Sequence, residues 1–226
     1  MTSDSEKALD LLTASRWLAP YPPGLAQALV QEGGLARLAA GRWAQAEGDE
    51  ETGLMVVVEG AVDLYCQAPG DREVRVGHAA AGAALGQAMR FGGGPRLATA
   101  VCAEASLILR VSDAGLERIA RERPDIWRAV AALVYLQLRS ALQMAAEIAT
   151  LPPRQRIAAR LLALTRSRPD PSVLNLNQQA LAELVGLTRK TVNGHLAAFR
   201  REGLVALEYG RIGLLDPRRL QLVADS

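Results

Sequence analysis

Hydrophobic residues first recur at helical spacing and then give way to short apolar runs. Residues 6–18 place apolar side chains three and four positions apart, which predicts an amphipathic helix. A second short helix is predicted over residues 25–31, after a break rich in proline. From about Leu35, short apolar segments alternate with glycine-containing turns, a pattern typical of an all-β sandwich or barrel. The predicted strands cover residues 54–58, 62–66, 74–77, 98–103 and 107–111.

Helical spacing returns after the last of these strands. Asp113 is the predicted N-cap of a helix over residues 114–121. Pro124 suits the first turn of the next helix, which meets no helix breaker before Pro152 and would be about 37 Å long at 1.5 Å per residue. An apolar, coiled-coil-like stripe follows that helix. It consists of Trp127, Val134, Leu138, Ala141, Ala145 and Ile148. Packing on the preceding barrel alone is one interpretation; self-association is favoured, because half of so long a helix would otherwise lack support.

A third section follows Pro152 and Pro153. A helix is predicted over residues 156–164 and a proline-containing loop over residues 167–172. Two short helices over residues 177–185 and 188–201 and a hairpin over residues 204–215 follow. In the hairpin, strands 204–207 and 211–215 flank Tyr209 and Gly210. Two short helices followed by a hairpin are typical of a winged helix-turn-helix.

Composition excludes several classes of protein. Half of the 226 residues are hydrophobic and 22% are charged, which suits a globular core and excludes disorder along the whole chain. No unbroken apolar run approaches the ~20 residues of a membrane span, and the polar N-terminus has no apolar h-region. We therefore expect a cytoplasmic protein that makes no membrane contact. The two cysteines, Cys66 and Cys102, are too few for a disulfide framework or a cysteine-only metal cluster.

Charge is distributed unevenly along the chain. Residues 1–150 hold 14 Lys and Arg against 18 Asp and Glu, a net charge of −4, whereas residues 151–226 hold 12 against 6, a net charge of +6. An acidic front and a basic back suggest that only the C-terminal section meets a polyanion, although small domains often differ by this much.

Residues 178–197 fit a helix-turn-helix unit. Ala182 is small where the two helices would cross, Gly186 lies at the turn, and the Thr188 hydroxyl can cap the second helix. Its small core would consist of Leu181, Val185, Leu187, Val192 and Leu196. A helical hairpin with a solvated basic face is the alternative. The threonine cap and the β-hairpin wing favour DNA binding.

The side chains expected to contact DNA begin at the first turns of the second helix. Arg189 can form a fork onto guanine, Asn193 can reach adenine, and Lys190 can bind guanine or phosphate. The phosphate candidates are Gln179, Thr188, Arg200 and, on the wing, Arg211. We expect the partner to be palindromic double-stranded DNA, read by two copies of the chain.

Taken together, these motifs resemble the CRP/FNR family of bacterial transcription regulators along essentially the whole chain. The similar segments are Gly48-Asp49, residues 54–62, Gly86, residues 96–98, 124–126 and 186–192. The resemblance implies an α+β fold with an N-terminal jelly-roll-like β-barrel sensor domain over residues 1–122, a dimerisation helix over 123–150 and a C-terminal winged helix-turn-helix over 151–226. It also implies a homodimer, a twofold-symmetric operator and contact with RNA polymerase.

The predicted ligand pocket departs from that of the cyclic-AMP-binding members of the family. Its positions here are Gly86, Gln87, Arg96, Leu97, Ala141 and Leu142. In those members a Glu, a Ser and two helix hydroxyls contact the nucleotide, whereas Gln87, Leu97 and an apolar pair stand here. Losing a partner for a buried polar group costs about 1–3 kcal/mol, and a micromolar affinity is about 8 kcal/mol. We therefore expect a degenerate pocket, with no effector or a different small molecule; the alternative is a module whose DNA binding depends on cyclic AMP or cyclic GMP.

Other cofactors and activities find little support in the residues. An iron–sulfur sensor needs four cysteines, and the chain has two. A haem sensor would need an axial ligand such as His78 or Cys66, but a lone histidine is more often hydrogen-bonded within its own domain. No nucleophile, paired-carboxylate or phosphate-loop motif is present. The sequence therefore predicts no cofactor, no metal and no enzymatic activity.

Overall fold

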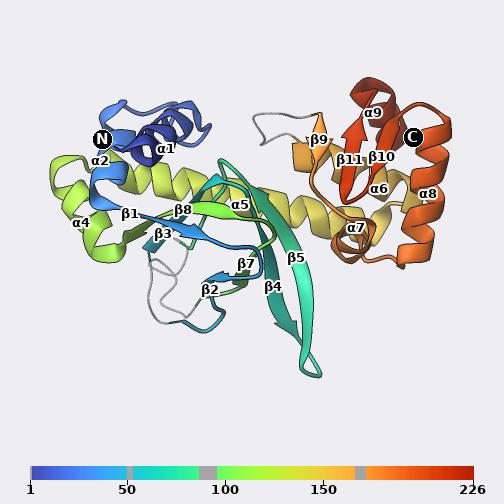
Figure 1. The fold of residues 1–226 in the computed structure, drawn as a ribbon, viewed down its shortest axis with the longest axis horizontal. Helices are drawn as coiled ribbons and strands as arrows, with labels where there is room; N and C mark the ends of the chain where they lie inside the picture. The colour runs from blue at the N-terminus through green and yellow to red at the C-terminus, as the bar shows by residue number, and fades with distance from the viewer. Residues whose placement is uncertain (1, 50–52, 87–95, 166–171) are drawn as a thin grey trace. The chain divides into compact units, whose positions relative to one another are not determined.

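The computed structural model describes residues 2–49, 53–86, 96–165 and 172–226 and combines helices with antiparallel sheets (Figure 1). The helices are α1 (Ser3–Ala14), α2 (Gly24–Glu32), α4 (Asp113–Glu122), α5 (Asp125–Thr150), α6 (Pro153–Thr165), α7 (Gln178–Val185), α8 (Arg189–Arg201) and α9 (Pro217–Asp225). The strands are β1 (Gly34–Leu38), β2 (Trp43–Gln45), β3 (Gly53–Glu59), β4 (Ala61–Ala68), β5 (Arg72–Ala80), β6 (Ala84–Leu85), β7 (Thr99–Cys102), β8 (Ser106–Ser112), β9 (Val173–Leu174), β10 (Val205–Glu208) and β11 (Arg211–Leu214). The predicted fold class is confirmed: antiparallel N-terminal strands, a long helix and a C-terminal helix-turn-helix.

The chain divides into two compact units, and the boundary falls within α5. Unit 1 comprises residues 1–73 and 77–138, and unit 2 comprises residues 74–76 and 139–226. The division into residues 1–122, 123–150 and 151–226 stays a prediction.

Unit 1 contains two four-stranded antiparallel sheets, in the orders β1-β8-β3-β6 and β2-β7-β4-β5. The continuous apolar run of β3 is explained by burial on both faces. Leu54 and Val56 belong to the core beneath the helices, whereas Met55 and Val57 belong to a second core shared with residues of β4 and β7. Side chains alternate between the faces of a strand, so a strand covered on both sides needs apolar residues at every position.

Four helices cover the sheet that contains β3. Leu12 of α1, Leu29 of α2, Leu116 of α4 and Ile126 of α5 are almost fully buried in one hydrophobic core with that sheet. The first half of α5 is therefore anchored on unit 1 by its own apolar face. At about 25 cal/mol per Å² of apolar surface, each such side chain contributes roughly 1.5–3 kcal/mol to folding.

Several local predictions for unit 1 were wrong in detail. The first helix ends at Ala14 rather than residue 18, where the Ser15 backbone N–H donates to the Leu12 carbonyl. The N-cap of α4 is Ser112, whose hydroxyl accepts from the Gly115 N–H, and not Asp113. Strands β1, β2 and β6 were not predicted; in the structure they pair with β8, β7 and β3.

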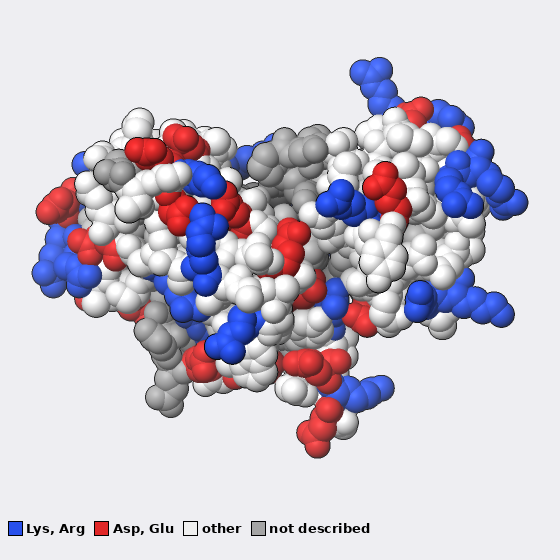
Figure 2. Space-filling view, viewed as in Figure 1, with Lys and Arg blue, Asp and Glu red and all other residues white. Residues whose placement is uncertain are grey.

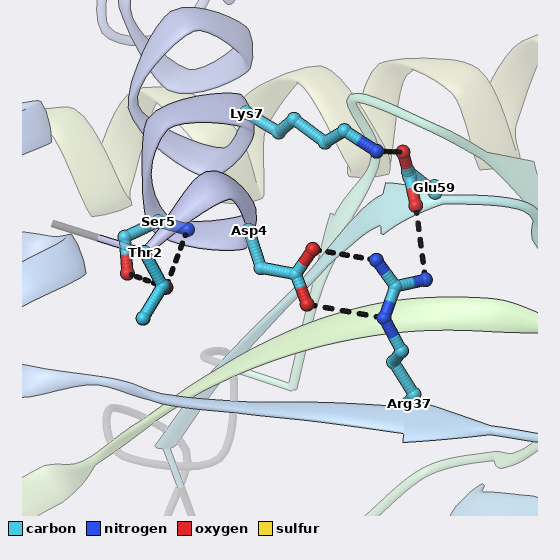
Figure 3. A network of polar contacts seen from close by, with 6 residues as sticks. All are labelled: Thr2, Asp4, Ser5, Lys7, Arg37 and Glu59. Atoms are coloured by element: carbon cyan, nitrogen blue, oxygen red, sulfur yellow. Dashed lines mark hydrogen bonds and ion pairs between the residues drawn. The ribbon is translucent and has the colours of Figure 1, made fainter.

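A surface ion-pair network joins α1 to strands β1 and β3 (Figure 3). Arg37 donates to both carboxylate oxygens of Asp4, at 2.5 and 3.1 Å, and to Glu59 Oε2 at 3.3 Å. Lys7 donates to the other Glu59 oxygen. The hydrogen bond from Lys7, followed by the charges of Lys7 and Arg37, lowers the pKa of Glu59. The network therefore fastens the N-terminal helix to the sheet with charges that water still reaches.

Unit 2 has its own core, which contains side chains from α6 to α9 and from the three-stranded sheet β10-β11-β9. The final helix α9 was not predicted, although Asp216 and Pro217 carry a start signal. The Asp216 carboxylate accepts from the Arg219 N–H at 2.9 Å, and Pro217 occupies the first helical turn. The predicted loop over residues 167–172 lies largely outside the described residues.

Candidate nucleic-acid interface and ligand pocket

The turn between α7 and α8 follows from one glycine. Asn177 caps α7 by accepting the Ala180 N–H at 2.8 Å, and the helix ends at Gly186, whose φ of 63° and ψ of 38° are left-handed. The Gly186 and Leu187 N–H groups donate back to carbonyls of the last turn, including Ala182. Because a side chain disfavours this backbone conformation, Gly186 turns the chain sharply into α8.

Helix α8 has one fully buried face and one exposed face. Val192, Leu196 and Phe199 are buried in the core of unit 2, and the Thr188 hydroxyl caps the helix by accepting the Thr191 N–H at 3.2 Å. Arg189 and Lys190 project from the exposed first turn. The charged side chains seen over α8 and α9 in Figure 2 are mostly cationic. Unit 2 therefore presents a capped helix with a positively charged N-terminal turn, which suits a polyanion.

A concave surface of about 440 Å³ lies between the helix-turn-helix and the hairpin β10–β11. It brings together three of the predicted DNA-contacting residues, Gln179, Arg189 and Arg211. The Gln179 amide donates to Glu183 Oε1 at 2.9 Å, which holds this side chain at the first turn of α7. Sequence reasoning missed Tyr209, which lines the same surface at the hairpin turn and is fully exposed. The available signal was an aromatic residue at the two-residue turn of a hairpin.

The remaining predicted contacts lie elsewhere on α8. Arg200 is exposed in the last turn, roughly 16 Å along the helix from Arg189 at 1.5 Å per residue. Asn193 is half-buried, and its Oδ1 is enclosed without a hydrogen-bond partner among the described residues. Contact with adenine through both amide atoms would therefore require this side chain to rotate.

Helix α5 exposes a broad apolar face from Tyr135 onward. Tyr135, Leu138 and Leu142 are 63%, 55% and 63% exposed, and Ile148 is also exposed. Of the predicted stripe, Ala141 and Ala145 are exposed and Val134 is half-buried, whereas Trp127 packs against the core of unit 1. The most exposed apolar side chains thus include Tyr135 and Leu142, which the stripe left out.

By length and composition α5 also qualifies as a membrane span. Its mean hydropathy reaches 1.3 over an 18-residue window of which 17% is buried. The sequence contains no unbroken apolar run as long as a membrane span, because charged residues interrupt α5. These residues are few and lie far apart, so the helix is apolar on average. A single such helix is weak support for a membrane span, since helices that associate with other protein surfaces share this composition.

The last turns of α5 are tied to α6 by a buried ion pair. Arg160 donates to Glu147 Oε2 at 2.5 Å, and both side chains are less than a tenth exposed. Burial lowers the pKa of Arg160, and the Glu147 carboxylate opposes that shift. Two charges held out of water in this way fix one relative position of the two helices within unit 2.

The predicted ligand pocket shows an arginine that already has a protein partner. Arg96 Nη1 donates to Gln45 Oε1 at 2.7 Å, and its guanidinium lies where a Cβ on Gly86 would be only 2.4 Å away. Gly86 has a φ of 91°, so this position favours glycine on both counts. Leu97 is 71% exposed, and Gln87 lies outside the described residues. Ala141 and Leu142 are exposed on the part of α5 that belongs to unit 2.

The haem candidates have other environments. His78 Nδ1 lies 2.8 Å from Asp63 Oδ1, and the His78 side chain is almost fully buried. The Cys66 thiol donates to the Leu97 carbonyl at 3.1 Å, and burial, with a smaller effect of Glu47, raises the pKa of this thiol. Among the residues that the structure describes, no group of three or more His, Cys, Asp or Glu is suited to a metal ion. The absence of a cofactor stays a prediction.

Comparison with known proteins gives consistent matches to both units. The family model of the Crp-like helix-turn-helix domain matches residues 155–223, and that of the cyclic nucleotide-binding domain matches residues 35–123. The nitrogen fixation regulation protein FixK of Bradyrhizobium diazoefficiens is 30% identical over 185 residues, which cover 79% of this chain and 76% of FixK. The cyclic AMP receptor protein of Thermus thermophilus is 28% identical over 178 residues, covering 79% and 82%.

Solved structures show the same fold. FixK2 from Bradyrhizobium japonicum aligns with a TM-score of 0.74 at 21% identity, covering 84% of this chain and 96% of FixK2. At this level of identity, the likeness concerns the fold alone.

Proposed function

The chain belongs to the CRP/FNR family of DNA-binding transcription regulators, which are not enzymes, and from this premise we propose that it acts as a homodimer on a palindromic operator without requiring cyclic AMP. The observation that carries the proposal is the exposed first turn of α8. There, Arg189 shares one concave surface with Gln179 and Arg211. One helix turn can thus offer base-reading cations while flanking groups bind phosphate.

Within each operator half-site, Arg189 reads guanine, and Lys190 binds guanine or phosphate. Gln179 and Arg211 bind backbone phosphates from the two sides of the concave surface, and Thr188 and Arg200 bind phosphates near the two ends of α8. Asn193 reads adenine after its side chain rotates. We further propose that the protein contacts RNA polymerase and that it acts in the cytoplasm; its relatives' role as transcription regulators supports that location.

The homodimer forms through the exposed apolar face of α5. Tyr135, Leu138, Leu142 and Ile148 lie on one side of the helix, and the small residues Ala141 and Ala145 lie between them. Small residues among large ones let two helices approach closely, and exposed large apolar side chains gain free energy when a second copy covers them. Two copies related by a twofold axis place two α8 helices at successive major grooves.

Independence from cyclic AMP rests on the side chains of the pocket. A cyclic phosphate would share Arg96 with Gln45, which already accepts from Nη1, and would meet Leu97, which has no hydrogen-bonding side chain. The missing polar partners each cost about 1–3 kcal/mol. Ala141 and Leu142 likewise offer no side-chain hydrogen bond to a base. The pocket is therefore degenerate, and the protein is either active without an effector or gated by a different small molecule.

Cyclic-nucleotide-dependent DNA binding is the second candidate. Arg96 favours it, since an arginine beside a glycine backbone is suited to a phosphate, and relatives include a protein named cyclic AMP receptor protein.

In the deciding experiment, purified protein selects palindromes from random duplex DNA in parallel with and without cyclic AMP. The Kd for the selected DNA is then measured by fluorescence anisotropy under both conditions. We expect one Kd under both conditions. A Kd at least tenfold lower with cyclic AMP, abolished by Arg96→Ala, would refute the first proposal and establish the second. A chain that binds no palindrome under either condition would refute the second candidate and the effector-independent form of the first proposal.

A further inference from the structure

The exposed face of α8 carries a glycine that the fold does not require. Gly194 lies in the middle of the helix and is exposed, and a Cβ built there meets no other atom within 4 Å. Its φ is not among the positive values found at ten other glycines. Neither packing nor backbone conformation therefore explains the residue, although glycine in a helix interior lowers the folding equilibrium roughly fivefold relative to alanine.

The neighbours of Gly194 leave a bare stretch of helix between two cations. Lys190, Gly194, Ala197 and Arg201 are four, three and four positions apart, so they share one face. Asn193, next to the glycine, projects about 100° around the helix from it and so lies off this face. The middle of this face consequently presents backbone and one methyl group, with Lys190 one turn before and Arg201 one turn after.

We propose that Gly194 is a close-approach point at which the α8 backbone contacts base edges on the floor of the major groove. This inference rests on the proposed placement of α8 in that groove. A helix with side chains is about 10–12 Å wide, nearly the ~12 Å width of the groove, whereas Cα atoms lie only about 2.3 Å from the axis. Without a side chain at Gly194, the helix can descend until its backbone meets the bases, and the two flanking cations reach the phosphates.

The chemistry of this bare stretch also selects the base pair beneath it. Gly194 and Ala197 present C–H groups and no side-chain hydrogen-bonding group. The apolar feature of the major-groove edge is the C5 methyl group of thymine. The half-site position under Gly194 is therefore an A·T pair whose thymine methyl packs against the helix backbone. Gly194 has no side chain that could read a guanine there.

The test measures the affinity of wild type, Gly194→Ala and the control Lys190→Ala for the selected operator. The same measurements are made on operators in which deoxyuridine replaces thymine at one position at a time. For Gly194→Ala we expect Tm of the free protein to rise by about 2–4 °C, since alanine favours the helix. Its affinity for the operator should fall tenfold or more, as for a mismatched base pair. In wild type, uracil at one step should weaken binding about fourfold, and Gly194→Ala should abolish that difference. Lys190→Ala should weaken binding to the thymine operator and to the uracil-substituted operator by the same factor.

Each alternative outcome decides the matter. If wild type binds no palindrome, the proposed function itself fails. If wild type binds and Gly194→Ala binds as tightly or more tightly, the close approach is refuted and the glycine has no role in recognition. If Gly194→Ala lowers Tm together with affinity, the glycine serves the fold and the inference is again wrong. If no thymine-to-uracil change weakens wild-type binding, the assigned A·T contact is wrong.

Discussion

Glu147 and Arg160 form a buried ion pair in unit 2. The Nη2 to Oε2 distance is 2.5 Å, and the side chains are 8% and 9% exposed. Arg160 Nε is enclosed without a hydrogen-bond partner among the described residues, so the pair only partly compensates the loss of water. Removing one member leaves the other as an unpaired buried charge, whereas removing both leaves no charge to compensate.

The magnitudes follow from this geometry. Arg160→Met or Glu147→Leu alone should lower the free energy of unfolding by about 3–5 kcal/mol, a large part of the 5–15 kcal/mol typical of a folded protein. This corresponds to a fall in Tm of roughly 6–20 °C for a chain of this length. The double variant Glu147→Leu/Arg160→Met should come within about 1 kcal/mol of wild type or exceed it, because apolar side chains of similar size replace the pair.

Urea unfolding followed by circular dichroism, with wild type, both single variants and the double variant, measures the coupling directly. The double variant should lose far less free energy of unfolding than the sum of the two single losses. Single losses below about 1 kcal/mol would match an exposed ion pair and would refute the assignment of a desolvated one. Additive losses in the double variant would show that each side chain stabilises unit 2 through other contacts.

Four further predictions concern the DNA interface, the dimer and the N-terminal network. Arg189→Ala should cost about 1–3 kcal/mol of DNA-binding free energy and relax specificity at one base pair per half-site; uniform weakening on all sequences would contradict base reading. Leu138→Glu should convert the dimer to a monomer in sedimentation equilibrium, while Gln143→Glu, exposed on the same helix, should not. Tyr209→Ala should weaken DNA binding with Tm unchanged, since the ring makes no buried contact; equal affinity would remove the wing tip from the interface. Because the folded pKa of Glu59 is lowered, its stabilising contribution is present above the unfolded pKa and is lost as pH falls through the folded value. The Tm difference between wild type and Glu59→Gln should therefore shrink as the pH falls below the ordinary pKa range of glutamate, and a constant difference would contradict this linkage.

Local signals in the sequence predicted the elements that depend on neighbouring residues. The positive φ of Gly186, the capping hydroxyl of Thr188 and the uninterrupted course of α5 each follow from interactions within a few positions, and each is present in the structure. The same applies to Val192 and Leu196 on the buried face of α8, because helical spacing alone places them together; Phe199, which was not predicted, joins them in the structure.

Tertiary structure decided the features that join distant segments. The partner of Arg96 is Gln45, 51 residues away, and the buried pair of Glu147 and Arg160 joins two different helices. Trp127 shares the helical spacing of the predicted stripe, yet it packs on unit 1 instead of facing outward. Sequence alone determined which side chains α5 and α8 offer and in what order. Only the packed chain decided which of them water still reaches, because burial depends on surfaces that come together when remote segments fold onto one another.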